Sequence, residues 1–245
     1  MNYIKINDKT TYPKEFIKFC EDNKEKLLNT FSTRWKLDSS TEFFEMINNM
    51  LGDYEIECYH AARTLNEHNY YESGLLQPIE DYELANLLFS PIEHLIPKDL
   101  LSKCYETLKE ILKRKEFNYL HFVICDECDV NMENGFLMLK KYGGELVEDT
   151  FANVQKNYSN NACKFYEKNI SHLGKPVVIK FKVKLNDIIN YANNDIVIVD
   201  LYLFMLKKVL LEDNLHYFKA LFIYKPVDKK DIISVDDYMG DDLDE

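Results

Sequence analysis

The chain has 245 residues, 46% of them apolar, with 17 Tyr, 15 Phe and a formal net charge of −12. This length and composition are sufficient for one large domain with a sizeable core, and they exclude a chain that is disordered throughout. The acidic balance argues against general nucleic-acid binding, which needs clustered Lys and Arg to neutralise phosphates. It fits a soluble cytoplasmic protein, or one that binds a basic partner surface.

Neither a membrane span nor a disulfide framework is expected. The longest apolar run, 196–206, contains Asp200 and is far shorter than the roughly 20 residues that a helix needs to cross a bilayer. The N-terminus has no signal-peptide core, so the six cysteines are expected to be reduced thiols. Cys125 and Cys128 form a lone CxxC without a second ligand pair, and we therefore expect no metal site.

Hydrophobic periodicity predicts helices and strands in alternation. Helices are expected at 13–31, about 42–51, 81–89, 98–113, 131–142, 185–191 and 199–212, with mixed helix and loop at 153–169. Strands are expected at 54–60, 119–125, 145–151, 176–183 and 217–224. Gly143 and Gly144 are expected to end the helix at 131–142. Strands that are few and unevenly separated by helices predict an α+β fold.

Three regions are expected along the chain. Residues 1–52 form a helical N-terminal extension that packs onto the next region. Residues 53–235 form the α+β domain. Residues 236–245 hold six acids in ten positions, and they are expected to form an acidic, disordered tail.

Polar chemistry is most concentrated in Tyr59-His60-Ala61-Ala62-Arg63. The alternation over 54–60 predicts a half-buried strand that ends at His60, with Arg63 three residues further on. A histidine can hydrogen-bond a ligand hydroxyl, and the planar fork of an arginine suits a phosphate, so the pair would suit a nucleotide. The alternative is a His60 satisfied by backbone groups and an Arg63 in a surface ion pair.

The same five residues, then a short helix, then Gly74-Leu75-Leu76-Gln77-Pro78 resemble the first motif of the ADP-ribosyltransferase superfamily, in its small bacterial and phage-borne branches. In that superfamily a first strand ends in a His or Arg that holds the ribose of NAD. Looser similarity extends over 54–235, through Gly143-Gly144-Glu145 and through 218–226 followed by Asp231-Ile232-Ile233. The resemblance implies a split β-sheet domain with the helical extension added in front.

The resemblance also implies a reaction and a site. ADP-ribose would be transferred from NAD, which is a substrate, without a metal, through an oxocarbenium-like state of the kind seen in glycoside cleavage. His60 would bind ribose hydroxyls and Arg63 would bind phosphate or ribose. A tyrosine would stack on nicotinamide, with Tyr70, Tyr71 and Tyr142 as candidates.

The carboxylate that such a reaction requires is displaced in this sequence. The superfamily's catalytic Glu usually lies at the start of the closing strand, where this chain has Leu215-His216-Tyr217-Phe218-Lys219 and no acid. Glu145, after the Gly-Gly pair, and Glu212 are the candidates to replace it, in that order. The alternative for Glu145 is a solvated acid that follows the end of a helix.

Two classes of function are indicated, and a third is weaker. The first is an ADP-ribosyltransferase of bacterial conflict: a toxin, a defence factor or a phage-encoded modifier with an unidentified macromolecular acceptor. The second is a catalytically inactive interaction protein, of the immunity or anti-defence type, that binds a basic partner. The missing Glu, the charge of −12 and the acidic tail favour the second. The third is a nucleotide hydrolase or sensor that uses the expected NAD pocket to bind ligands derived from NAD.

Overall fold

The computed structural model describes residues 3–31, 42–75, 81–114, 120–125, 141–158, 161–188, 194–211, 215–223 and 226–238. Over this part the protein is an α+β structure, as predicted from the sequence. The strands are β1 (Tyr3–Ile4), β2 (Glu55–Thr64), β3 (Leu120–Ile124), β4 (Lys175–Lys184), β5 (Lys219–Ile223) and β6 (Ile232–Asp237). The α-helices are α1 (Lys14–Asp22), α2 (Lys24–Phe31), α3 (Glu42–Leu51), α4 (His68–Ser73), α5 (Asp81–Phe89), α6 (Lys98–Arg114), α8 (Gly144–Tyr158), α9 (Ala162–Asn169) and α10 (Asn194–Leu210). Short 3-10 helices are η1 (Lys9–Thr11), η2 (Ser90–Leu95), η4 (Leu185–Asp187) and η5 (Lys229–Asp231).

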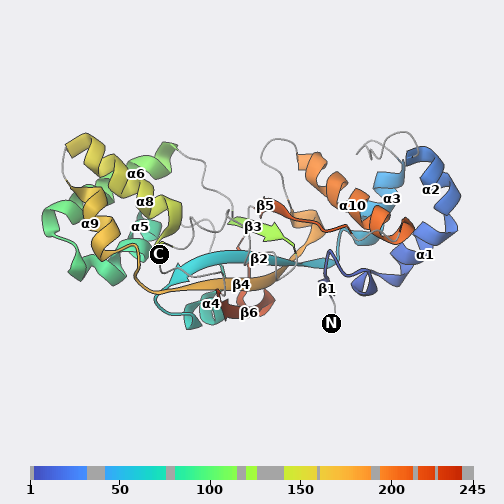
Figure 1. The fold of residues 1–245 in the computed structure, drawn as a ribbon, viewed down its shortest axis with the longest axis horizontal. Coiled ribbons are helices and arrows are strands. Elements are labelled where there is room, and N and C mark those ends of the chain that lie inside the picture. The colour runs from blue at the N-terminus through green and yellow to red at the C-terminus, as the bar shows by residue number, and fades with distance from the viewer. Residues whose placement is uncertain are drawn as a thin grey trace.

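The sheet is organised around one long antiparallel pair. The strand order is β5-β3-β2-β4-β6 with antiparallel neighbours, and β1 pairs in parallel with the start of β2. The β2–β4 register runs from Glu55 opposite Lys184 to Thr64 opposite Lys175. Figure 1 shows this pair extending between two groups of helices, with α1, α2, α3 and α10 at one end and α5, α6, α8 and α9 at the other.

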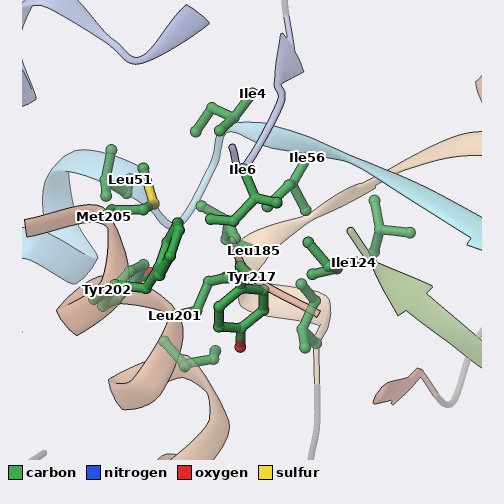
Figure 2. Close-up of a cluster of buried hydrophobic side chains, with 14 of the residues drawn as sticks. Ile4, Ile6, Leu51, Ile56, Ile124, Leu185, Leu201, Tyr202, Met205 and Tyr217 are labelled. Carbon is green, nitrogen blue, oxygen red and sulfur yellow. The ribbon is translucent and has the colours of Figure 1, made fainter. Parts of the chain in front are cut away.

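One face of the sheet carries the main core of the protein. It joins buried side chains of β1, α1, α3, β2, β3, β4 and α10, and Figure 2 shows the part in which Ile4, Leu51, Ile56, Leu201 and Tyr202 meet. Helix α10 is apolar over most of its surface, which is typical of a helix buried on several sides. The segment predicted as an N-terminal extension, 1–52, therefore shares its core with the sheet.

A second core lies in the helices at the other end of the molecule. We call residues 81–114 and 141–173 the helical lobe. Its buried side chains come from α5, η2, α6, α8, α9 and the segments that flank α8 and α9. Phe151 is at its centre, with its ring 5.1 Å from that of Tyr166 and 6.4 Å from that of Phe89. The main core and the lobe core have no residue in common in the described part of the chain.

Several sequence predictions are confirmed and others are wrong. The strands at 119–125, 176–183 and 217–224 and the helices at 81–89 and 98–113 are present as β3, β4, β5, α5 and α6. The strand predicted at 145–151 is wrong, because α8 occupies it and buries Val147, Phe151 and Val154 at helical spacing. Residues 153–169 belong to α8 and α9, and the helix at 13–31 is divided at Asn23.

The boundaries of other elements also differ from the prediction. Gly143 precedes α8 and Gly144 is its first residue, whereas the helix predicted at 131–142 lies almost entirely outside the described residues. Helix α10 begins at Asn194, and only η4 is described in the helix predicted at 185–191. Strand β6, where a turn and the start of the tail were predicted, includes Asp236 and Asp237 and pairs with β4. The tail from 239 onward lies outside the described residues.

Candidate functional site

The two side chains that the sequence analysis paired lie on opposite faces of β2. The strand continues to Thr64, four residues beyond its predicted end, and side chains alternate between faces along a strand. His60 shares a face with Ile56 and Cys58 of the main core. Arg63 shares the other face with Tyr59 and Ala61, which belong to a small separate cluster. The side chains of His60 and Arg63 therefore point to opposite sides of the sheet and do not converge on one site.

Arg63 holds the turn that connects α9 to β4. Its Nε donates to the carbonyl oxygen of Leu173 at 2.9 Å, and its Nη2 donates to that of His172 at 2.8 Å. Partial burial lowers the pKa of the guanidinium below its usual value, although the group remains charged at any physiological pH. The planar fork that was expected to hold a phosphate thus binds two neighbouring backbone carbonyls.

On the His60 face, burial decreases toward the end of β2. Ile56 and Cys58 are fully buried, whereas His60, Ala62 and Thr64 are only half-buried. Helix α4 lies over this end of the face, since Tyr70 packs against the main core and interacts with the Thr64 side chain. Burial raises the pKa of Tyr70, and the contact with Thr64 opposes that rise. This part of the face is half-buried and lies beside α4, and Ala62 and Tyr70 pack there against the main core.

The Gly74-Leu75 turn ends α4. Gly74 has a φ of 75°, in the left-handed region that favours glycine, and a Cβ there would lie 2.1 Å from the Val227 carbonyl oxygen. Leu75 and Val227 exchange backbone hydrogen bonds of 3.0 Å in both directions. The motif singled out from the sequence therefore folds back and is fixed against the segment between β5 and β6.

The three candidate tyrosines occupy three different environments. Tyr71 is 45% exposed, and its hydroxyl oxygen accepts the Val235 N–H of strand β6 at 2.8 Å. Tyr142 is buried in the lobe core, where its hydroxyl donates to the Leu88 carbonyl at 2.9 Å and burial raises its pKa to about 12. Tyr70 is the candidate that lies over the His60 face.

Neither candidate carboxylate has a described side chain. The backbone of Glu145 lies in the first turn of α8, in the helical lobe, and its side chain is outside the described part of the structure. Glu212 is outside it entirely.

A buried carboxylate that the sequence analysis missed is present on the Arg63 face. Glu57 is 5% exposed, accepts from the Tyr59 hydroxyl at 2.6 Å and lies 3.8 Å from the Lys5 Nζ. Its Oε2 has no hydrogen-bond partner among the described residues. The alternation Glu57-Cys58-Tyr59-His60 was the available signal, because it places Glu57 and His60 on opposite faces. Glu57 therefore cannot serve as the carboxylate of a His60-centred site.

In the described part of the chain, the thiols and metal-ligating side chains suggest no additional centre. Burial raises the pKa of Cys104 to about 12 and that of Cys58 well above its usual value, so both are protonated at neutral pH. No group of three or more His, Cys, Asp or Glu side chains close enough to hold a metal is found within the described residues. Cys128, the second cysteine of the CxxC, lies outside them.

The comparisons leave the family open. No helix in the described ranges is long and apolar enough to cross a membrane. No protein-family model, curated protein or solved structure matches this chain.

Proposed function

We propose that the protein binds NAD on the His60 face of the sheet, beneath α4, and transfers ADP-ribose from it. The observation that carries this proposal is the half-buried stretch His60, Ala62 and Thr64, which Tyr70 of α4 contacts at Thr64. A histidine and an aromatic ring on the same face of the strand would supply a hydrogen-bonding group and a flat apolar surface, as a nucleoside requires.

The chemistry assigns different roles to different parts of this region. His60 binds the ribose hydroxyls, and the Tyr70 ring is the surface on which nicotinamide stacks. As the nicotinamide–ribose bond breaks, the developing positive charge on the ribose requires a carboxylate, which Glu145 or Glu212 supplies. Arg63 faces away from this region, so phosphate binding falls to other groups. The setting implied by the sequence resemblance is bacterial conflict, with a macromolecular acceptor.

Calorimetric titration with NAD tests the binding step, and His60→Ala is the informative variant. His68 in α4 provides a matched control, because its side chain is exposed and lies outside the proposed pocket. We expect His60→Ala to abolish measurable NAD binding and His68→Ala to bind like the parent protein. Transfer of label from radioactive NAD to proteins of a cell lysate then tests the reaction. The proposal is refuted if the parent protein neither binds NAD nor transfers label.

The second candidate function is that of an inactive interaction protein that binds a basic partner. It is favoured by the use of Arg63 and Tyr142 in bonds to backbone carbonyls, and by the net charge of −12. A complex with a basic protein that weakens as salt is raised, together with no NAD binding, would support this function. NAD turnover by the isolated protein would contradict it.

A further inference from the structure

The turn after β2 is organised by the hydroxyl of Thr64. This hydroxyl donates to the Asn66 carbonyl oxygen at 3.1 Å and accepts the Asn66 N–H at 3.2 Å. The side chain of Asn66 continues the turn, because its Oδ1 accepts the His68 N–H at 3.1 Å and its Nδ2 donates to the Asn69 Oδ1, also at 3.1 Å. His68 is the first residue of α4, so the last residue of β2 fixes the position at which the helix starts.

Tyr70 is the residue of α4 that meets Thr64. A side-chain hydrogen bond joins the two hydroxyls, and the ring of Tyr70 packs against the main core. At the backbone, the Tyr70 carbonyl oxygen accepts the Gly74 N–H at 2.9 Å, where the helix ends. The helix backbone therefore fixes the Cα of Tyr70, and Thr64 fixes the hydroxyl at the far end of the side chain.

The bond to Thr64 selects one rotamer of Tyr70. Rotation about χ1 into another staggered well would carry the phenol oxygen away from the strand and break the bond. Thr64 lies on the same face of β2 as His60, at the end where that face is only half-buried. The Thr64 hydroxyl thus holds the aromatic ring on the side of the strand that carries the histidine.

We propose that Thr64 is a positioning residue of the NAD site, whose hydroxyl holds the Tyr70 ring in the orientation that receives nicotinamide. The inference rests on the proposed function for the identity of the ligand, whereas the contact itself can be tested without NAD. A ring that is already held in one rotamer loses less conformational entropy when a ligand stacks on it. The Thr64 hydroxyl therefore increases the affinity for NAD without touching the ligand.

A double-mutant cycle in NAD calorimetry tests whether Thr64 acts through Tyr70. Thr64→Val and Tyr70→Phe each remove one hydroxyl of the pair, and Tyr70→Phe leaves the bonds between Thr64 and Asn66 in place. We expect each variant to weaken NAD binding by about 3- to 10-fold, the effect of one lost hydrogen bond. The double variant should bind no more weakly than the single variants.

Two further variants serve as controls for the cycle. Thr64→Ser keeps the hydroxyl and should bind NAD like the parent protein. Thr10→Val removes an exposed threonine hydroxyl that donates to Asp8, away from β2, and it should also bind like the parent. Losses that add up in the double variant overturn the proposal, because the two hydroxyls would then act separately. Equal weakening by Thr64→Ser and Thr64→Val overturns it as well.

Carbon-13 NMR of ring-labelled tyrosine tests the contact in the absence of NAD, with the Tyr70 signal assigned by its loss in Tyr70→Phe. Burial raises the pKa of Tyr70 and the bond to Thr64 opposes that rise, so in Thr64→Val the signal should titrate at a higher pH than in the parent protein. An unchanged titration refutes the positioning contact. Failure of the parent protein to bind NAD refutes the proposed function, and with it the role of Thr64 in that site, whatever the titration shows.

Discussion

Phe151→Ala is expected to unfold the helical lobe and leave the sheet folded. The side chain is fully buried, and its ring lies 5.1 Å from that of Tyr166, 6.3 Å from that of Phe165 and 6.4 Å from that of Phe89. Replacing a buried Phe by Ala costs about 3–5 kcal/mol, because transfer free energy is lost and a cavity remains. A domain of the size of the helical lobe has a free energy of unfolding on the order of 5 kcal/mol, so the substitution would remove most of the stability of the lobe.

Amide hydrogen exchange measured segment by segment provides the assay for this prediction. In Phe151→Ala we expect protection to fall in α5, α6, α8 and α9 and to persist in β2 and β4. Phe181→Ala is the matched variant, because Phe181 is equally buried but belongs to the main core, and it should remove protection from the sheet. Equal loss of protection in the lobe and in the sheet for both variants would show one cooperative unit and refute the independence of the two cores.

Three further predictions concern single contacts. Tyr71→Phe removes the hydrogen bond to the Val235 N–H and should lower the unfolding free energy by about 0.5–1.5 kcal/mol in a urea titration; no change would mean that water replaces the hydroxyl. Gly174→Ala should cost at least about 1–2 kcal/mol, because a left-handed residue acquires a Cβ that would lie 2.4 Å from the Thr64 carbonyl oxygen; a neutral effect would rule out this close contact. Burial raises the pKa of Tyr142 to about 12, above the usual value for an unfolded tyrosine, so its contribution is complete below about pH 10 and is lost as the pH rises toward 12. The unfolding free energy should therefore fall between about pH 10 and 12, and it should fall less steeply in Tyr142→Phe. Equal slopes in the two proteins would contradict the raised pKa of Tyr142.

Periodicity was sufficient to predict an element where the element is long and one of its faces is buried. Helix α6 and strand β4 were predicted because the helical repeat of the one and the strand alternation of the other continue over the whole element. The segment 145–151 misled the prediction because seven residues contain fewer than two complete helical turns. Its helical spacing becomes clear only when Val154 is included. Strand β6 was missed because it is short and its pairing partner, β4, is distant in sequence.

The predicted pairing of His60 with Arg63 depended on a single boundary, the end of β2. Placing the end of β2 at His60 made Arg63 part of a following turn, from which its side chain could have returned to the same side. With β2 continuing to Thr64, the period of two separates the pair. The environments of Tyr70, Tyr71 and Tyr142 depend on contacts with Thr64, with Val235 and within the helical lobe. Such distant contacts are absent from any local pattern, so the sequence could not distinguish these tyrosines.

The long β2–β4 pair has a consequence for the order of events during synthesis. Strand β2 leaves the ribosome well before β4, and the helical lobe is made between them. The central contact of the lobe, Phe89 with Phe151, joins residues that are closer in sequence than any β2–β4 pair, and the sheet must wait for β4. Since contacts that span fewer residues form faster, we expect the lobe to fold first. A folded lobe shortens the effective loop between Thr64 and Lys175, and strand pairing can then propagate from that end toward Glu55 and Lys184.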